Sequence, residues 1–498
     1  MHIKSQLTKI ITDALNQLGV TSSNITVTEA TKPEFGDYQY NGAMALAKEL
    51  KSNPREIANK IADIIKTNPI FSDVSVAGPG FLNLTLESTF IAKNLPLALN
   101  ERAGVAKKSD PIKVVVDYSS PNMAKQMHVG HLRSTIIGDT IANLFEFLGD
   151  EIIRQNHIGD WGTQFGMLIA YFEENGKESN SKLSDLEEFY KEAKACFDAD
   201  EEFAKRAREY VVKLQGGDAK CLSLWSAFIE KSLEHCQDVY DTLGVKLDKS
   251  AVKSESSYND DLAQVVQDFQ KKGISTKSQD AECIFFEGSD NPLIIQKSDG
   301  GFLYATTDLA AIKFRTQELG AKRICYVVDA RQSEHFKQVF AAARRVGYAT
   351  DDVKLEHIAF GVMLDKSGKP FKTRDGGTVK LKDLIDESIK RARDIISRAN
   401  EYTPKELEKI AYTVGVGSLK YADLSINRQS NYIFDWDKML SLDGNTALYM
   451  QYAYARINSI LNRAKDVAIT LETPLIEDEL ERRLALKILT LDDTLYRA

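Results

Sequence analysis

Two histidines three residues apart, His128 and His131, are the side chains in this chain best suited to chemistry. Residues three apart at the start of a helix lie on one face, and a helix N-terminus favours anions because its first N–H groups are unpaired. Two imidazole donors there could hold the phosphates of a nucleotide and stabilise charge that moves during a displacement. Gly130 would leave room for the ligand against the backbone. The same spacing also fits a pair of capping or core histidines.

The elements around the histidines predict where they lie. An apolar run at 112–118 is typical of a buried strand, and apolar residues at helical spacing follow over 132–148. A second strand is predicted at 151–154. The polar residues and glycine that follow it are Asn156, His157, Gly159 and Asp160. Ligands of open α/β sheets bind at the carboxyl ends of the strands, so these residues are expected to line the same site. His157 also fits a buttress behind that site.

The segment between the first strand and its helix carries a family signature. Lys125 precedes the run His-Val-Gly-His at 128–131, which resembles the H-I-G-H signature of the class I aminoacyl-tRNA synthetases. The strings at 132–139 and 154–166 are similar to those of the arginyl-tRNA synthetases in particular, and the resemblance extends over almost the whole chain. It implies a ligase that uses ATP, with Mg²⁺, to activate L-arginine and then transfers the arginyl group to tRNA(Arg). It also implies that the adenylate forms only with tRNA bound.

A second ATP-binding signature of this family, the K-M-S-K-S loop, is matched by the segment 368–378, which is glycine-rich and cationic. Its candidate residues are Lys369, Phe371, Lys372 and Thr373. The resemblance implies that the two lysines act in catalysis and that the last three residues bind ATP. The segment lacks the signature's usual second lysine, which in many arginyl enzymes is replaced by a lysine before the first histidine, here Lys125. A solvated basic loop is the alternative.

Five residues match the arginine-binding set of the family: Asn122, Glu255, Tyr304, Asp308 and Gln332. The resemblance implies that Glu255 and Asp308 pair with the guanidinium, which suits planar carboxylates, and that Asn122 and Gln332 hold the α-amino and carboxylate end. Tyr304 and Asp308 lie one helical turn apart, so both could face one cavity. From the residues alone, Glu255 also fits a surface acid, Asp308 a helix cap and Tyr304 a core aromatic.

The chain as a whole is predicted to be an α/β protein of three domains. The first is an α+β domain at 1–108, which the resemblance implies binds the tRNA elbow. The second is a doubly wound Rossmann-like catalytic domain at 109–440 with a helical insertion near 175–250; further strands of its parallel sheet are expected at 283–286, 293–295, 324–328 and 357–360. The third is a partial all-α anticodon-binding domain at 441–498. Family members continue beyond this point, so a C-terminal truncation is expected.

The composition narrows the class of protein. A net charge of −8 over 498 residues disfavours indiscriminate binding to nucleic acid, although a specific RNA partner would need only a local basic face. No apolar run approaches a membrane span, and five scattered cysteines favour a reduced, cytoplasmic protein that does not bind membranes. The histidines lack zinc-ligand spacing, so no metal ligands are predicted. The family suggests a monomer. Two alternatives stay open: a nucleotidyltransferase with a small substrate, and an inactive or RNA-binding synthetase fragment.

Overall fold

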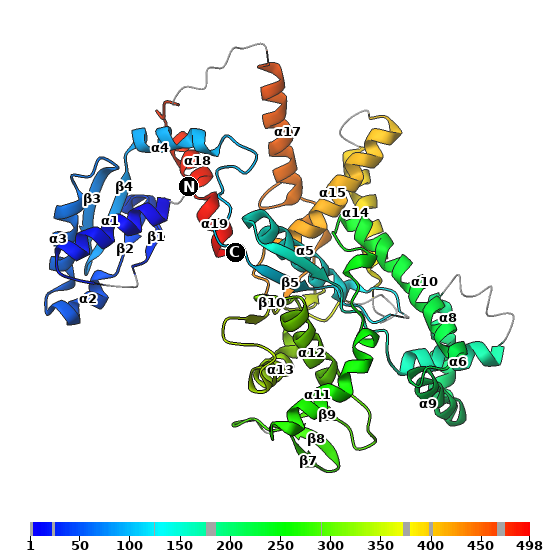
Figure 1. Cartoon of the computed structure of the whole chain (residues 1–498). Helices are drawn as coiled ribbons and strands as arrows, with labels where there is room; N and C mark the ends of the chain where they lie inside the picture. Colours follow the sequence, from blue (N-terminus) through cyan, green and yellow to red (C-terminus); the bar gives the residue numbers. More distant parts are fainter. Residues whose placement is uncertain are drawn as a thin grey trace. The chain divides into compact units, whose positions relative to one another are not determined.

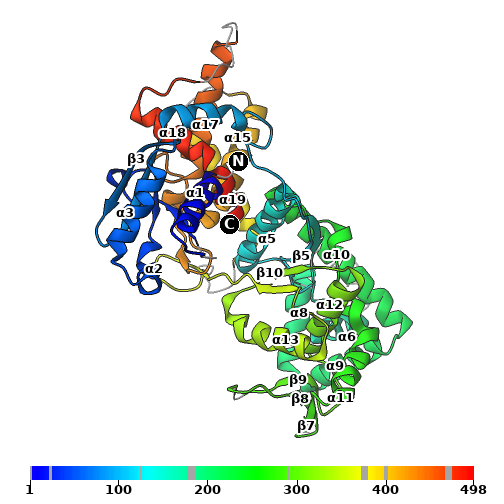
Figure 2. The ribbon, with the colours of Figure 1, turned by 60° about the vertical axis from the view of Figure 1, so that its left-hand side comes forward.

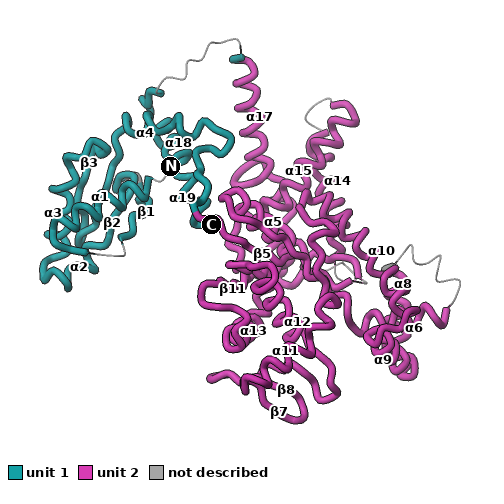
Figure 3. Tube along the Cα trace, in the orientation of Figure 1, with its two compact units in different colours: residues 1–109, 464–498 teal, residues 110–463 magenta. Residues whose placement is uncertain are grey.

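The computed structural model describes residues 3–21, 25–123, 125–175, 186–289, 291–371, 379–397, 402–465 and 474–498. The chain divides into two units, one of residues 1–109 with 464–498 and one of residues 110–463 (Figure 3). The smaller unit has one hydrophobic core and the larger has two. Across the described ranges, no helix is both long enough and apolar enough to cross a membrane.

The larger unit is built on a parallel four-stranded sheet in the order β11-β10-β5-β6. Its strands are β5 (Lys113–Asp117), β6 (Glu151–Gln155), β10 (Arg323–Tyr326) and β11 (Lys354–His357). Val114 and Val116 lie in one core and Val115 in the other, so helices cover both faces. The helix α5 (Val129–Leu148) lies on one face, and α12 (Tyr304–Lys313) and α13 (Ser333–Val346) lie on the other (Figure 1). This confirms the doubly wound α/β fold.

Two of the strands predicted for this sheet lie elsewhere. The runs 283–286 and 293–295 fall in a separate antiparallel sheet of order β7-β8-β9, beside α11 (Asn259–Lys271) in Figures 1 and 2. Its strands are β7 (Thr276–Ser278), β8 (Ala281–Ile284) and β9 (Leu293–Gln296). A short apolar run predicts a strand but does not reveal its partner, which is why this assignment was wrong. The last parallel strand also begins three residues before the predicted run at 357–360.

Helices make up most of the remaining larger unit. The segment predicted as an insertion contains α8 (Leu186–Ala199), α9 (Glu201–Gln215) and α10 (Ala219–Leu243), after α6 (Thr163–Asn175). The later helices are α14 (Leu381–Ile396), α15 (Pro404–Leu424), α16 (Trp436–Met439) and α17 (Ala447–Arg463). Short helical turns are η3 (Lys249–Ala251), η4 (Glu255–Tyr258), η5 (Phe314–Glu318) and η6 (Ala330–Gln332). One two-residue strand, β13 (Tyr432–Ile433), interrupts this helical part and pairs with β12 (Met363–Leu364).

A buried ion pair fixes the helix that carries the histidines. Nε of Arg133 on α5 lies 3.0 Å from both carboxylate oxygens of Asp423 on α15. Nη1 of the same arginine donates to the carbonyl oxygen of Gly361. Both charged side chains are almost fully buried, so removing either partner would leave the other charge buried without a counter-charge. The pair therefore holds the start of α5 in a defined position.

The smaller unit combines helices with an antiparallel sheet of order β1-β2-β4-β3. Its strands are β1 (Val27–Glu29), β2 (Tyr38–Tyr40), β3 (Phe71–Ala77) and β4 (Phe81–Leu86), and its N-terminal helical elements are α1 (Ile3–Gln17), η1 (Pro33–Phe35), α2 (Ala43–Leu50), α3 (Pro54–Ile65), α4 (Ser88–Asn94) and η2 (Leu95–Ala98). The sequence places α2 and α3 accurately because Asn53 caps α3 and Pro54 begins it.

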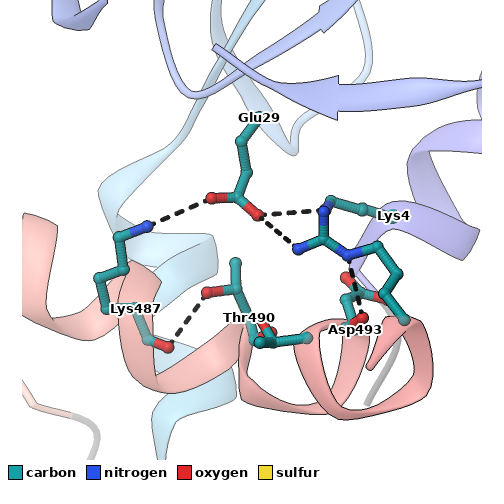
Figure 4. Close-up of polar contacts among 7 residues, drawn as sticks. Lys4, Glu29, Lys487, Thr490 and Asp493 are labelled. Atoms are coloured by element: carbon teal, nitrogen blue, oxygen red, sulfur yellow. Dashed lines mark hydrogen bonds and ion pairs between the residues drawn. The ribbon is translucent and has the colours of Figure 1, made fainter. Parts of the chain in front are cut away.

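Two C-terminal helices, α18 (Glu479–Leu489) and α19 (Leu491–Arg497), belong to this smaller unit rather than with 441–463, where the sequence analysis grouped them. Ala485 and Leu489 are buried in its core. Nη1 and Nη2 of Arg482 donate to the carboxylate of Asp37 at 3.0 and 2.7 Å. Lys4 and Lys487 donate to Glu29 at 3.1 and 3.2 Å (Figure 4). Charged contacts thus join the two ends of the chain.

Candidate active site

A cavity of about 670 Å³ opens at the carboxyl edge of the parallel sheet. Residues that follow β5, β6, β10 and β11 line it, together with the first turns of α5, α12 and α13. The predicted site residues that it brings together are Asn122, His128, Gly130, His131, His157, Gly159, Glu255, Tyr304, Asp308, Gln332 and Phe371. This is where open α/β sheets bind their ligands.

Six predicted residues are not among those that line the cavity. Asn156 and Asp160 are buried and accept hydrogen bonds from the backbone of Ser120 and Ser256 instead, and the other four are Lys125, Lys369, Lys372 and Thr373. Nζ of Lys125 lies 4.9 Å from the centre of the Tyr190 ring, but its charge still contributes to lowering the pKa of His128. The backbone N–H of Lys369 donates to Asp365 at 3.1 Å, while the next residues of the chain, Pro370 and Phe371, reach the cavity. The other two, Lys372 and Thr373, lie outside the described residues.

The two histidines form a reciprocal cap at the start of α5. Nδ1 of His128 accepts the backbone N–H of Gly130 at 3.0 Å, and Nδ1 of His131 accepts the backbone N–H of His128 at 3.1 Å. The capping interpretation is therefore correct, and it does not exclude the chemical one. Because Nδ1 accepts in both rings, the proton of each neutral imidazole is on Nε2. Each ring can thus present an N–H donor to the cavity that it lines.

The environment keeps these imidazoles neutral. Burial lowers the pKa of His128, and the charge of Lys125 lowers it further. Burial, together with the repulsion that a protonated His128 would exert, lowers the pKa of His131 to about 3. A Cβ at Gly130 would lie 2.7 Å from Cε1 of His128, so the space beside this glycine holds that ring rather than the ligand. Two neutral imidazoles, each with its proton on Nε2, therefore lie at the positive end of a helix.

A strained loop positions Asn122. Ser119 and Ser120 have φ angles of 69° and 44°, in the left-handed region that residues other than glycine rarely adopt. The backbone N–H of Ser120 donates to Oδ1 of Asn156 at 3.0 Å, which helps to hold this conformation. A Cβ at Gly159 would lie 2.1 Å from Oδ1 of Asn122. Only glycine at 159 therefore lets the amide of Asn122 take its place at the cavity.

Two carboxyl groups from distant parts of the chain also line the cavity. Glu255 belongs to η4 and Asp308 to α12. Burial, together with the charges of Asp160 and Asp308, raises the pKa of Glu255 to about 8. Asp160 accepts from the backbone N–H of Ser256 at 2.9 Å, and burial raises its pKa. A cation placed between Glu255 and Asp308 would relieve their repulsion, so the pair suits a guanidinium.

The raised pKa of Glu255 predicts how binding of the arginine expected from the sequence would depend on pH. At pH 7 the carboxyl of Glu255 is mostly protonated, and a bound guanidinium favours its ionised form, so binding releases a proton. The dissociation constant of arginine is expected to fall by up to about tenfold per pH unit as pH rises towards 8, and to level off above it. Calorimetric titration in buffers of different ionisation enthalpy would measure the proton released. The Glu255→Gln variant should lose this pH dependence, and a flat profile in the unmodified chain would contradict the prediction.

Two further histidines contribute to the cavity. Nδ1 of His157 lies 3.0 Å from the carbonyl oxygen of Lys253, which can only accept, so this ring carries its proton on Nδ1 when neutral. His335 was missed by the sequence analysis; its Nε2 lies 2.6 Å from Oδ2 of Asp308. It follows Gln332 by three positions, a spacing at the start of α13 that could have drawn attention to it.

Comparison with known proteins gives matches along almost the whole chain. A family model described as "tRNA synthetases class I (R), catalytic domain" matches residues 94–436, and one described as "Arginyl tRNA synthetase N terminal domain" matches residues 5–86. The arginine–tRNA ligase of Hahella chejuensis is 49% identical over all of this chain and 88% of the relative. That of Alteromonas mediterranea is 51% identical over 93% of this chain and 82% of the relative.

Solved structures show the same similarity. The crystal structure of the Plasmodium falciparum arginyl-tRNA synthetase matches with a TM-score of 0.85 and 33% identity, covering 99% of this chain and 87% of that one. The Thermus thermophilus arginyl-tRNA synthetase matches in fold with a TM-score of 0.84 at 23% identity, covering 100% of this chain and 87% of that one.

Proposed function

This chain belongs to the class I arginyl-tRNA synthetases, and on that basis we propose that it is an arginine–tRNA ligase whose chemistry takes place in the cavity beside His128. It uses ATP to activate L-arginine and transfers the arginyl group to tRNA(Arg). One observation carries the assignment of the site: a single cavity is lined both by the histidine pair at the N-terminus of α5 and by the two acids Glu255 and Asp308.

Activation needs placement and charge stabilisation rather than a covalent intermediate on the enzyme. A carboxylate oxygen of arginine attacks the α-phosphorus of ATP, the bond to the bridging oxygen breaks, and pyrophosphate leaves with the electron pair. The Nε2–H groups of His128 and His131 donate to the phosphate oxygens as negative charge moves towards the leaving group. Lys125 and Lys369 supply positive charge from outside the cavity lining, and Phe371 closes one side of it. The predicted roles of Lys372 in catalysis and of Lys372 and Thr373 in ATP binding stay predictions.

Arginine binds across the remaining part of the cavity. Glu255 and Asp308 receive the guanidinium, and Asn122 and Gln332 hold the α-amino and carboxylate groups. Tyr304, whose ring is on the first turn of α12, forms a wall beside Glu255. This orientation directs the carboxylate of arginine towards the histidines, as the in-line attack requires.

The other partners follow from the reaction. Mg²⁺ is proposed to enter with ATP, as the ATP chemistry of the family implies. The tRNA would contact the N-terminal domain with its elbow and the helical region with its anticodon. Tyr449, Tyr452 and Tyr454 on α17 are exposed, and Arg456 donates to the hydroxyl of Tyr452 at 3.1 Å, a combination that suits unpaired bases. We place the monomeric enzyme in the cytoplasm, which its five unpaired thiols support.

The decisive experiment is pyrophosphate exchange and arginylation with and without tRNA(Arg). We expect exchange that requires both arginine and the tRNA, followed by transfer to the tRNA. Exchange with a different small acid and no arginine would instead indicate a nucleotidyltransferase. The alternative of an inactive RNA-binding fragment is not favoured, because the catalytic match spans 94–436 and both histidines and both acids lie at one cavity. ATP binding without any exchange would revive that alternative.

A further inference from the structure

Asp308 has a close neighbour to which the reaction described above gives no role. Nε2 of His335, on the first turn of α13, lies 2.6 Å from Oδ2 of Asp308, on α12, and both residues line the cavity. From this contact we propose that His335 is a positioning residue, which holds the carboxylate of Asp308 in the orientation that receives the guanidinium of arginine. The proposal rests on the function proposed above and adds a determinant of its substrate affinity.

The chemistry of the contact assigns the proton. An ionised carboxylate can only accept, so Nε2 of His335 donates to Oδ2. This hydrogen bond leaves Oδ1 of Asp308 for the substrate. The contact uses one nitrogen of the imidazole and one oxygen of the carboxylate, whereas the fork of an arginine at this position would occupy both oxygens. His335 therefore restrains Asp308 while one carboxylate oxygen stays available to the guanidinium.

The neighbours of His335 make it a suitable restraint. Its ring packs edge-on against that of Phe336, with ring centres 5.4 Å apart. The Phe336 ring is buried and contacts Tyr326 of β10 and His357 of β11, at centre distances of 4.9 and 5.0 Å. A row of packed rings thus connects the parallel sheet to Asp308. Side chains held in this way define a binding geometry more precisely than a freely rotating carboxylate does.

The two acids of the pocket then have different tasks. The charge of Asp308 is one cause of the raised pKa of Glu255, so the two carboxyl groups lie close enough to influence each other. Glu255 is the member of the pair that carries a proton until the substrate arrives. Without His335, Asp308 would be free to turn away or to share a proton with Glu255. Arginine would then bind more weakly, while ATP would bind as before.

The test measures the KM of arginine, the KM of ATP and kcat for arginylation of tRNA(Arg). The His335→Ala variant is expected to raise the arginine KM by roughly tenfold to a hundredfold, the worth of a hydrogen bond to a charged group, with kcat and the ATP KM unchanged. The His335→Phe variant keeps an aromatic ring beside Phe336 but has no donor, so it should show the same rise. The His335→Gln variant restores an N–H donor and should recover most of the affinity. The Glu334→Ala variant, an exposed neighbour outside the cavity lining, is the matched control.

The outcomes separate this proposal from the function it rests on. If His335→Phe leaves the arginine KM unchanged, or if kcat and the ATP KM change as much as the arginine KM, the positioning role is wrong. If His335→Gln recovers no affinity, the hydrogen bond is not the cause. Asp308→Asn is measured alongside. If Asp308→Asn has the arginine KM of the unmodified chain, the assignment of the arginine pocket is wrong. If Asp308→Asn raises the arginine KM but the His335 variants do not, only the role of His335 is wrong.

Discussion

Replacing Asp308 by alanine is expected to raise the KM of arginine by roughly a hundredfold to a thousandfold. The guanidinium would then enter a half-buried pocket with only Glu255 to meet it, and truncating one partner of such a charge pair costs about 2–5 kcal/mol. The KM of ATP should stay unchanged, because Asp308 belongs to α12 and the histidines belong to α5. Steady-state arginylation with each substrate varied in turn would measure both constants.

The isosteric variant Asp308→Asn separates charge from shape. It keeps a side chain of the same size and an oxygen that His335 can still reach, but it removes the negative charge. An arginine KM close to that of Asp308→Ala would show that charge accounts for binding. An unchanged value in both variants would contradict the assignment of Glu255 and Asp308 as the receptor for the guanidinium.

The second large effect concerns His131. We expect His131→Ala to slow adenylate formation by roughly a hundredfold or more, the usual consequence of losing one donor to a developing charge. The same change removes the cap on the N–H of His128, which costs about 1 kcal/mol of stability. A loss of rate in this variant alone would therefore not distinguish the lost Nε2–H donor from the lost helix cap.

The His131→Asn variant separates the loss of the donor from the loss of the cap. The side-chain oxygen of asparagine can replace Nδ1 as the acceptor for His128, but asparagine has no group in place of Nε2–H. We expect a melting temperature close to that of the unmodified chain together with the full loss of rate in tRNA-dependent pyrophosphate exchange. If exchange in this variant is as fast as in the unmodified chain, the two histidines cap the helix and have no role in catalysis.

The site was predictable in parts, for different physical reasons. The strand at 112–118 and the helix after it follow from hydrophobic periodicity, and these two elements alone bring His128 and His131 to a sheet edge. Glu255 and Asp308 are far apart in sequence and belong to separate elements, so only the family resemblance connected them. His335 was missed because its three-residue spacing from Gln332 is a weak local signal, which a histidine on a helix surface would share with one that contacts a substrate-binding acid.

The fold was predictable to a similar degree. The helices at 43–50 and 54–65 were placed correctly from local signals such as the asparagine cap and proline of the second. The pairing of 283–286 with 293–295 was not, because both runs are apolar enough for either sheet. Pairing depends on contacts formed after collapse, which a single segment does not encode.

The closure of the smaller unit by its C-terminal helices has a consequence for how the chain is made. Asp37 and Arg482 are 445 positions apart, and Lys487 reaches back to Glu29 from still later in the chain. A ribosome adds about 5–20 residues per second, so the first domain emerges some tens of seconds before these partners exist. Asp37 and Glu29 lack these C-terminal partners throughout translation of the catalytic domain. The assembly of this unit is therefore completed last, although its synthesis begins first.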